Sequence, residues 1–166
     1  MDIIDNFLTE EDYKKIRKTI LSTGFPWHRS NIISGRNFKD DQMLNVQFKS
    51  TFFTRSKKPE DNSKGLKLVD PILKKINPTE LYRIKANLNV GRTNPVCTSF
   101  HIDCYDPGLT GIYYVNTCNG YTLFEESKIK VESVANRMLI FDNKLRHTGV
   151  TCTDNKFRVV INFNWR

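Results

Sequence analysis

The stretch "FRVVINFNW", residues 157–165, decides the fold class, because its side chains alternate between two kinds. In an extended chain, successive side chains point to opposite faces, so odd and even positions separate. One face is wholly apolar and consists of Val159, Ile161, Phe163 and Trp165. The other face is mixed and consists of Arg158, Val160, Asn162 and Asn164. We predict a strand whose apolar face joins a core and whose mixed face turns toward a partly polar interior.

Similar short segments precede this stretch from residue 81 onward. They are rich in β-branched or aromatic residues and are separated by Asn, Gly, Asp and Pro turns, as strands usually are. These segments are "LYRIKANLNV" (81–90), "TGIYYVN" (110–116), "YTLFE" (121–125), "KIKVES" (128–133) and "RMLIFD" (137–142). Several short strands in about eighty residues are typical of a β-sandwich or a barrel.

The first half of the chain carries two helical patterns. In "LTEEDYKKIRKTILSTG" (8–24), apolar residues recur at helical spacing and Thr9 can cap the helix. A second helix is expected at "SKGLKLVDPILKKIN" (63–77), with Pro71 near its middle or at a break. Between these helices, "NVQFKSTFFT" (45–54) reads as extended.

These patterns predict a mainly β protein of the α+β class, with helices buttressing one face of a β core. The length of 166 residues suits one domain. We expect helical support over about residues 1–80 and the β core over about residues 81–166. No linker divides the two parts.

Composition restricts the function only loosely. Lys and Arg total 26 against 18 acidic residues, which gives a formal net charge of +8. A basic protein favours acidic partners, including nucleic acid. The lysines are scattered, however, and form no polybasic tail, so a solubilising surface charge is the simpler interpretation.

The four cysteines show no C-x-x-C spacing, which argues against a zinc ribbon and a thioredoxin-like redox pair. The N-terminal sequence does not resemble a signal peptide, and no apolar run is long enough to span a membrane. We therefore expect an intracellular, cytoplasmic protein with free thiols and no membrane partner. The sequence does not predict the oligomeric state.

The candidate chemistry begins in "SFHIDCYD" (99–106), which reads as extended. In a strand, His101 and Asp103 would point the same way about 7 Å apart. His147 follows a predicted strand and can return beside them. Two imidazoles and one carboxylate form the facial triad of non-haem iron(II) oxygenases. The alternative is that these histidines are hydrogen-bonded core residues without a metal.

Arg158 is a further candidate for a functional residue, in addition to the two histidines and the aspartate. It heads the mixed face of the final strand, from which a guanidinium could project into a cavity. A buried guanidinium needs an anionic partner, and its planar fork suits a carboxylate. The alternative is an exposed or salt-bridged arginine.

The order of these residues resembles that of the 2-oxoglutarate- and iron(II)-dependent oxygenases, particularly the prolyl-4-hydroxylase-like branch. The pattern is H-x-D, then H after about forty residues, then R after about ten, with "GYTLF" and "SVANRMLIFD" between. The resemblance covers roughly residues 81–165, and "IIDNFLTEEDYKKI" is similar to the family's entry strand and helix. It implies a double-stranded β-helix, or jelly roll. It also implies that His101, Asp103 and His147 bind iron and that Arg158 holds the distal carboxylate of 2-oxoglutarate.

Three further residues are cosubstrate candidates by the same resemblance. Tyr114 matches a tyrosine whose hydroxyl binds the cosubstrate carboxylate, although it could simply pack in the sheet. Thr122 lies in a segment that matches the family's G-G-x-T, with Tyr121 in place of the second glycine. Asn87 lies on the strand where relatives place a polar side chain near the cosubstrate. His28, far from the triad in sequence, is expected on the surface or in a loop.

The resemblance implies Fe(II), 2-oxoglutarate and O2 as cofactors, and it admits ascorbate. The reaction it implies is hydroxylation of a C–H bond, with succinate and CO2 as coproducts. A peptidyl residue, proline by default, is the first substrate class, and a free amino acid or another small molecule is a second. Nucleic-acid base dealkylation is a third alternative, but such enzymes place a second arginine six residues after the first, where this chain has Asn164. A metal-free β-sandwich binding module is the non-enzymatic alternative.

Overall fold

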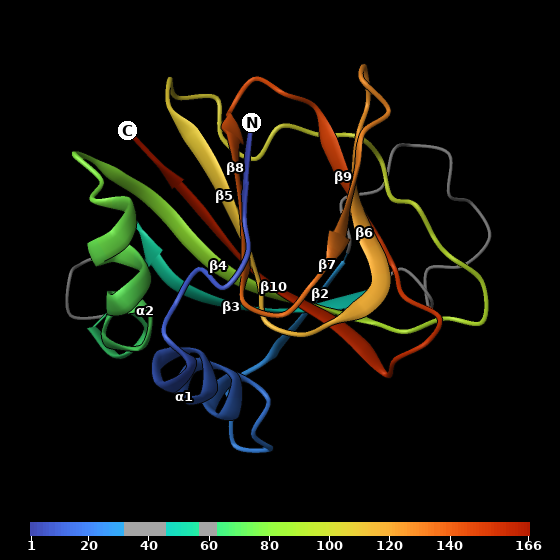
Figure 1. Cartoon of the computed structure of the whole chain (residues 1–166), viewed down its shortest axis with the longest axis horizontal. Helices are drawn as coiled ribbons and strands as arrows, with labels where there is room; N and C mark the ends of the chain where they lie inside the picture. The colour runs from blue at the N-terminus through green and yellow to red at the C-terminus, as the bar shows by residue number, and fades with distance from the viewer. Residues whose placement is uncertain (32–45, 57–62) are drawn as a thin grey trace.

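The computed structural model describes residues 1–31, 46–56 and 63–166, which form two antiparallel β-sheets and two helices (Figure 1). The larger sheet has the strand order β1-β8-β5-β10-β4-β3-β2, and the smaller sheet has the order β7-β6-β9. The strands are β1 (Asp2–Ile4), β2 (His28–Asn31), β3 (Val46–Thr54), β4 (Leu81–Val90), β5 (Leu109–Tyr114), β6 (Cys118–Phe124), β7 (Lys130–Ser133), β8 (Arg137–Asp142), β9 (His147–Val150) and β10 (Phe157–Trp165). The helices are α1 (Glu10–Ile20) and α2 (Ser63–Ile76).

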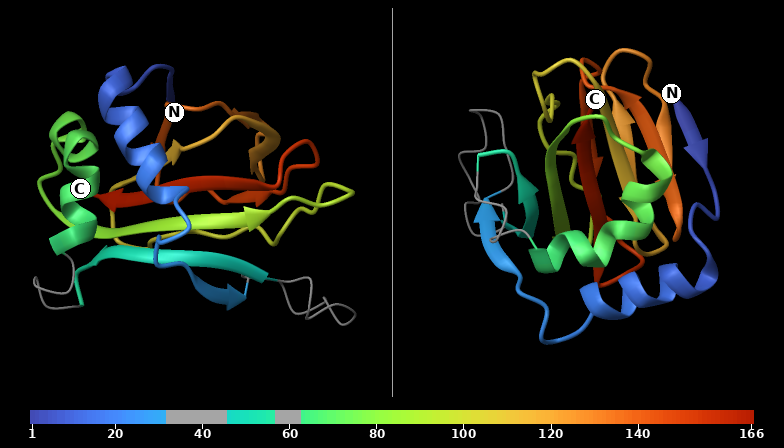
Figure 2. Two further views of the ribbon diagram at one scale, coloured as in Figure 1. Left: turned by 90° about the horizontal axis from the view of Figure 1, so that it is seen from below. Right: turned by 90° about the vertical axis from the view of Figure 1, so that its left-hand side faces the viewer.

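Strand β10 lies in the middle of the larger sheet, between β4 and β5. Its predicted apolar face packs into the main core, which also receives buried side chains from both helices. The helices accordingly cover one face of the larger sheet (Figures 1 and 2). The buried residues that join helices and sheet include Ile16, Ile20, Val69, Ile72, Val159, Ile161 and Phe163. The predicted buttressing by helices is confirmed.

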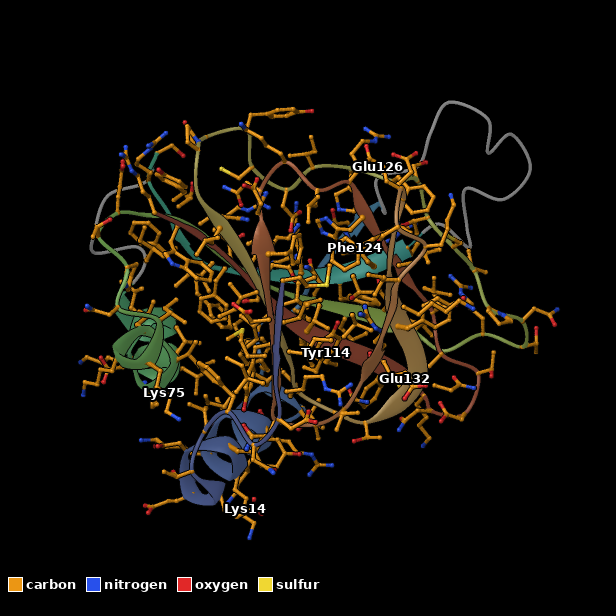
Figure 3. The ribbon with its side chains drawn as sticks, turned by 45° about the horizontal axis from the view of Figure 1, so that its top comes forward. Lys14, Lys75, Tyr114, Phe124, Glu126 and Glu132 are labelled. Carbon is orange, nitrogen blue, oxygen red and sulfur yellow. The ribbon has the colours of Figure 1, made fainter. Side chains whose placement is uncertain are left out.

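The opposite face of the larger sheet turns toward the smaller sheet. A second apolar cluster fills the space between them, and Figure 3 shows Tyr114 of β5 and Phe124 of β6 in the interior. This cluster consists of Ile112, Tyr114, Phe124, Val131, Leu139, Phe141 and Val160. The two facing sheets, with helices on the outside, are the predicted mainly β jelly-roll architecture.

The helix boundaries follow from local chemistry. Thr9 caps α1, since its Oγ1 accepts a hydrogen bond from the Asp12 backbone N–H at 3.2 Å. Pro71 lies inside α2 without ending it. Val69 and Ile72 on either side are fully buried, and this burial offsets the hydrogen bond that Pro71 cannot donate. Neither described helix has the length and apolar character needed to cross a membrane.

Several features differ from the sequence prediction. Residues 99–106 are not a strand, because His101 forms only an isolated bridge and Asp103 lies in a bend. His28 is exposed, as expected, although it begins the edge strand β2 and does not lie in a loop. Strand β9 was not predicted, since its four residues are too few to show alternation. Before residue 81, strands β3 and β1 agree with the predicted extended segment (45–54) and entry strand, whereas β2 was not predicted.

The core assignment leads to a stability prediction. Ile161 is fully buried at the helix–sheet interface, so Ile161→Ala should lower the free energy of unfolding by about 2–5 kcal/mol. Ile129 is 45% exposed, and Ile129→Ala should change it by less than about 0.5 kcal/mol. Urea unfolding followed by circular dichroism measures both variants. Equal losses in the two variants would contradict the assigned core.

Candidate active site

A backbone bridge brings His101 and His147 together. Each residue donates its backbone N–H to the carbonyl of the other, at 3.0 Å in both directions. Residues paired in this antiparallel manner project their side chains to the same side. The two imidazole rings consequently lie with their centroids 5.0 Å apart. Phe141 packs edge-on against the His147 ring at 4.8 Å and fixes its orientation.

Asp103 completes a three-residue cluster. Its Oδ1 lies 3.6 Å from His101 Nε2, and its Oδ2 lies 3.8 Å from His147 Nε2. One donor atom from each residue can be chosen so that all three lie within 4.8 Å of one another. Two imidazoles and one carboxylate this close can share one divalent ion and leave one side of it open. The predicted triad therefore converges, although its segment is not a strand.

Each imidazole is oriented by a backbone carbonyl two residues before it. His101 Nδ1 lies 3.0 Å from the Ser99 carbonyl oxygen, and His147 Nδ1 lies 3.1 Å from that of Leu145. A proton on Nδ1 satisfies each carbonyl and leaves the Nε2 lone pair directed toward the cluster. This arrangement is the one that metal-binding histidines normally adopt.

The Asp103 carboxylate, 6% exposed, has two further partners. Asn162 donates from Nδ2 to Oδ2 at 2.7 Å, and Arg83 forms an ion pair with Oδ1 at 3.1 Å. Burial alone would raise the pKa of Asp103, but the two neighbouring imidazoles and the charge of Arg83 hold that pKa well below its usual range. Sequence reasoning assigned neither Asn162 nor Arg83 a role, although each lies on the same strand face as a predicted site residue.

Arg158 lies in the same cavity as the triad and is 2% exposed. Its guanidinium is held by hydroxyl groups: Nε donates to Ser133 Oγ at 2.7 Å, and Nη2 donates to Thr122 Oγ1 at 3.0 Å. Among the described residues, no carboxylate lies within 4.0 Å of it. The arginine is thus neither exposed nor salt-bridged within the described chain. A buried guanidinium in this state favours an anion from outside the protein.

Gly120 and Gly149 have no side chains, which leaves room for the side chain of Arg158. A Cβ at Gly120 would lie 2.8 Å from Arg158 Cδ, and one at Gly149 would lie 3.2 Å from Nη1. Gly149 also lines the cavity, so the Nη1 side of the guanidinium borders it. A side chain at Gly120 would clash with Arg158 Cδ, and one at Gly149 would crowd the guanidinium.

The cavity that joins these groups has a volume of about 70 Å³, enough for several water molecules or a small organic acid. Its lining is mostly polar and consists of Gln47, Lys85, Asn87, Asn89, Thr98, His101, Asp103, Ile112, Thr122, His147, Gly149, Thr151, Arg158, Val160 and Asn162. Six of the seven predicted site residues belong to it.

Tyr114 is the predicted residue that does not line the cavity. Its hydroxyl lies 2.8 Å from Thr122 Oγ1, and the Arg158 guanidinium lies 5.5 Å from its ring centroid. Burial raises the pKa of the Tyr114 hydroxyl, which therefore stays protonated. In this structure Tyr114 lies outside the cavity lining, where its hydroxyl contacts Thr122 and its ring faces the Arg158 guanidinium. Asn87 does line the cavity, and its Oδ1 is buried without a hydrogen-bond partner in the described chain.

A second cluster of metal-ligand types lies elsewhere. Cys118, Cys152 and Asp154 also offer donor atoms within 4.8 Å of one another. Burial raises the pKa of the Cys152 thiol to about 11, so this thiol keeps its proton and donates it to the Asn155 carbonyl. The Asp154 carboxylate already accepts the Asn119 backbone N–H. Cys152 and Asp154 are engaged within the protein and do not line the cavity described above, whereas all three triad residues line it.

No protein-family model matches this sequence, and no curated protein matches it. Solved structures do match. A prolyl hydroxylase from Trichoplax adhaerens, solved with a hypoxia-inducible-factor peptide fragment, is 17% identical with a TM-score of 0.63. The match covers 99% of this chain and 82% of that one.

Two other matches come from different enzymes. A viral collagen prolyl hydroxylase from Paramecium bursaria Chlorella virus 1, solved with 2-oxoglutarate, is 15% identical with a TM-score of 0.59, over 98% of this chain and 93% of that one. A non-haem α-ketoglutarate-dependent epimerase from nogalamycin biosynthesis is 11% identical with a TM-score of 0.64, over 99% and 76%. At these identities the similarity shows the fold, which is the jelly roll of the 2-oxoglutarate/iron(II) oxygenases. The predicted fold resemblance is confirmed.

The triad geometry predicts metal binding. Asp103→Ala should weaken binding of Mn²⁺, measured by isothermal titration calorimetry, by about a hundredfold or more, because it removes the one anionic ligand. Asp154→Ala, a matched change in the second cluster, should leave the Mn²⁺ affinity unaltered. If Asp154→Ala abolished binding and Asp103→Ala did not, the triad would not be the metal site.

Proposed function

We propose that this protein is a 2-oxoglutarate- and iron(II)-dependent oxygenase that hydroxylates a C–H bond of its substrate. The observation that carries the proposal is one cavity that combines a triad of metal-ligand side chains with a buried cation. The triad of His101, Asp103 and His147 lines this cavity, and so does Arg158, whose buried guanidinium has no carboxylate partner in the described chain. A diacid that binds a metal through one end and a cation through the other matches both.

The donor set fits ferrous iron. Imidazole and carboxylate ligands suit Fe(II), and a three-residue triad leaves positions for a cosubstrate and O2. When bound, iron and 2-oxoglutarate supply oxidative decarboxylation to succinate and CO2, coupled to insertion of oxygen into a C–H bond. Ascorbate would serve as an accessory reductant.

The protein's own groups bind and orient. Arg158 would hold the distal carboxylate of 2-oxoglutarate, with Ser133 and Thr122 fixing the guanidinium in place. Asn162 and Arg83 hold the Asp103 carboxylate, and the Ser99 and Leu145 carbonyls hold the two imidazoles. Asn87 presents an unpaired oxygen to the cavity, where it can orient a bound group.

For the substrate, we propose an amino-acid residue, with peptidyl proline as the first to test. The similarity to the Trichoplax prolyl hydroxylase, which was solved with a peptide fragment, supports this choice. Base dealkylation is disfavoured by Asn164. This residue stands where those enzymes carry a second arginine, and it is fully buried and donates to Thr110 Oγ1 at 3.0 Å.

The enzyme class is tested by adding Fe(II) and 2-oxoglutarate without oxygen. We expect a charge-transfer absorption band, and after admission of air we expect succinate. His101→Ala should abolish succinate release while the circular dichroism spectrum is retained. A wild-type protein with neither the band nor succinate would instead be a metal-free binding module.

Arg158 has its own test. Arg158→Met should raise, by about tenfold or more, the 2-oxoglutarate concentration at which the charge-transfer absorption band reaches half its maximum. The reason is that the distal carboxylate loses a buried ionic partner. Arg17→Met, which removes the same charge from the exposed side of α1, should leave that concentration unchanged. Equal values in the wild type and Arg158→Met would remove Arg158 from the cosubstrate site.

A further inference from the structure

The cavity contains a second cation that the proposed cosubstrate does not use. Lys85 of β4 lines the cavity and is the strand partner of Asn162 of β10. Asn162 lies four positions beyond Arg158, which is about 13 Å along the strand. Lys85 is thus paired with the strand position that contacts Asp103 and lies four positions away from Arg158.

The Lys85 ammonium has little compensation within the protein. The side chain is half-buried, and no hydrogen bond or ion pair within 4.0 Å joins its Nζ to any residue in the described parts of the chain. Burial lowers the pKa of Lys85, and the charges of Arg83 and Lys49 lower it further, while Asp103 raises it. Asp103 is already shared between Asn162 and Arg83. Lys85 therefore presents a cation to the cavity that the described residues leave unpaired.

Asn162 adds a hydrogen-bond acceptor beside this cation. Its Nδ2 donates to the Asp103 carboxylate, and only the nitrogen of an amide can do so, which fixes the amide orientation. Its Oδ1 is then the free end. That oxygen is buried and has no hydrogen-bond partner among the described residues. A buried acceptor of this kind is stabilised by an N–H donor from a ligand.

Lys85 and Asn162 together indicate the class of substrate. This inference rests on the proposed oxygenase function. We infer that Lys85 and Asn162 form a subsite for an amino-acid unit that carries a free carboxylate. The carboxylate binds Lys85 Nζ, and an N–H of the substrate donates to Asn162 Oδ1. The carboxylate can belong to a free amino acid or to an acidic residue of a peptide. An uncharged peptide or a nucleobase would leave Lys85 unpaired.

The test compares matched acids and amides. Protein loaded with Mn²⁺ and 2-oxoglutarate without oxygen is titrated calorimetrically with proteinogenic L-amino acids and with their carboxamides. Capped Glu-Pro-Gly and Gln-Pro-Gly peptides form the second arm. We expect the acid to bind at least about tenfold more tightly than its amide in one arm, which identifies the source of the carboxylate.

Substitutions tie this preference to the subsite. Lys85→Met should remove the preference for the acid, and Lys85→Arg should keep most of it. Lys14→Met removes the same charge from the outer surface of α1, far from the interior in Figure 3, and should not affect the preference. The inference is overturned if acids and amides bind equally in both arms. It is also overturned if Lys85→Met weakens 2-oxoglutarate rather than the acid, or if a methylated oligonucleotide binds in preference to either.

The experiments distinguish an error in the proposed subsite from an error in the proposed enzyme class. Without the Fe(II)–2-oxoglutarate absorption band, the proposed function itself is wrong. With the band present and no acid preferred over its amide, only the subsite is wrong.

Discussion

The register of β10 is the constraint on which the site depends. One face of this strand packs against the helices, and the other carries Arg158, Val160 and Asn162 into the cavity. Because side chains alternate with a period of two, a slip of one residue would exchange these faces. Arginine and asparagine would then enter the helix–sheet core, and valine and phenylalanine would face the triad. Burial of the apolar face therefore fixes where the polar groups of the site lie.

A second constraint brings the triad together. The backbone bridge between His101 and His147 joins an irregular segment to β9, and β9 in turn pairs with β6. Asp103 is then held from the opposite side by Asn162 of β10. Groups from both sheets thus meet at one point. The site is arranged by the packing of the two sheets and does not require the H-x-D segment to be a strand.

The sequence allowed prediction of those features that depend on local patterns. Alternation in residues 157–165 predicted both faces of β10, and the order His101, Asp103, His147, Arg158 predicted the residues that share one cavity. Features that depend on tertiary contacts were not predicted. Ser133 was not identified as a partner of Arg158, because a serine in a short strand carries no sign of what it will contact. The extended reading of residues 99–106 was wrong, since a single bridge to His147 and a bend replace the regular pairing.

The central claim is that one ion and one diacid share the same cavity, with the diacid lying between the ion and Arg158. Anomalous diffraction from crystals grown without oxygen, with Fe(II) and 2-oxoglutarate, tests it most directly. The account predicts a single iron peak within bonding distance of His101 Nε2, His147 Nε2 and an Asp103 oxygen, with a carboxylate of 2-oxoglutarate against Arg158. An iron peak at Cys118 and Cys152, or a 2-oxoglutarate molecule bound away from Arg158, would contradict it.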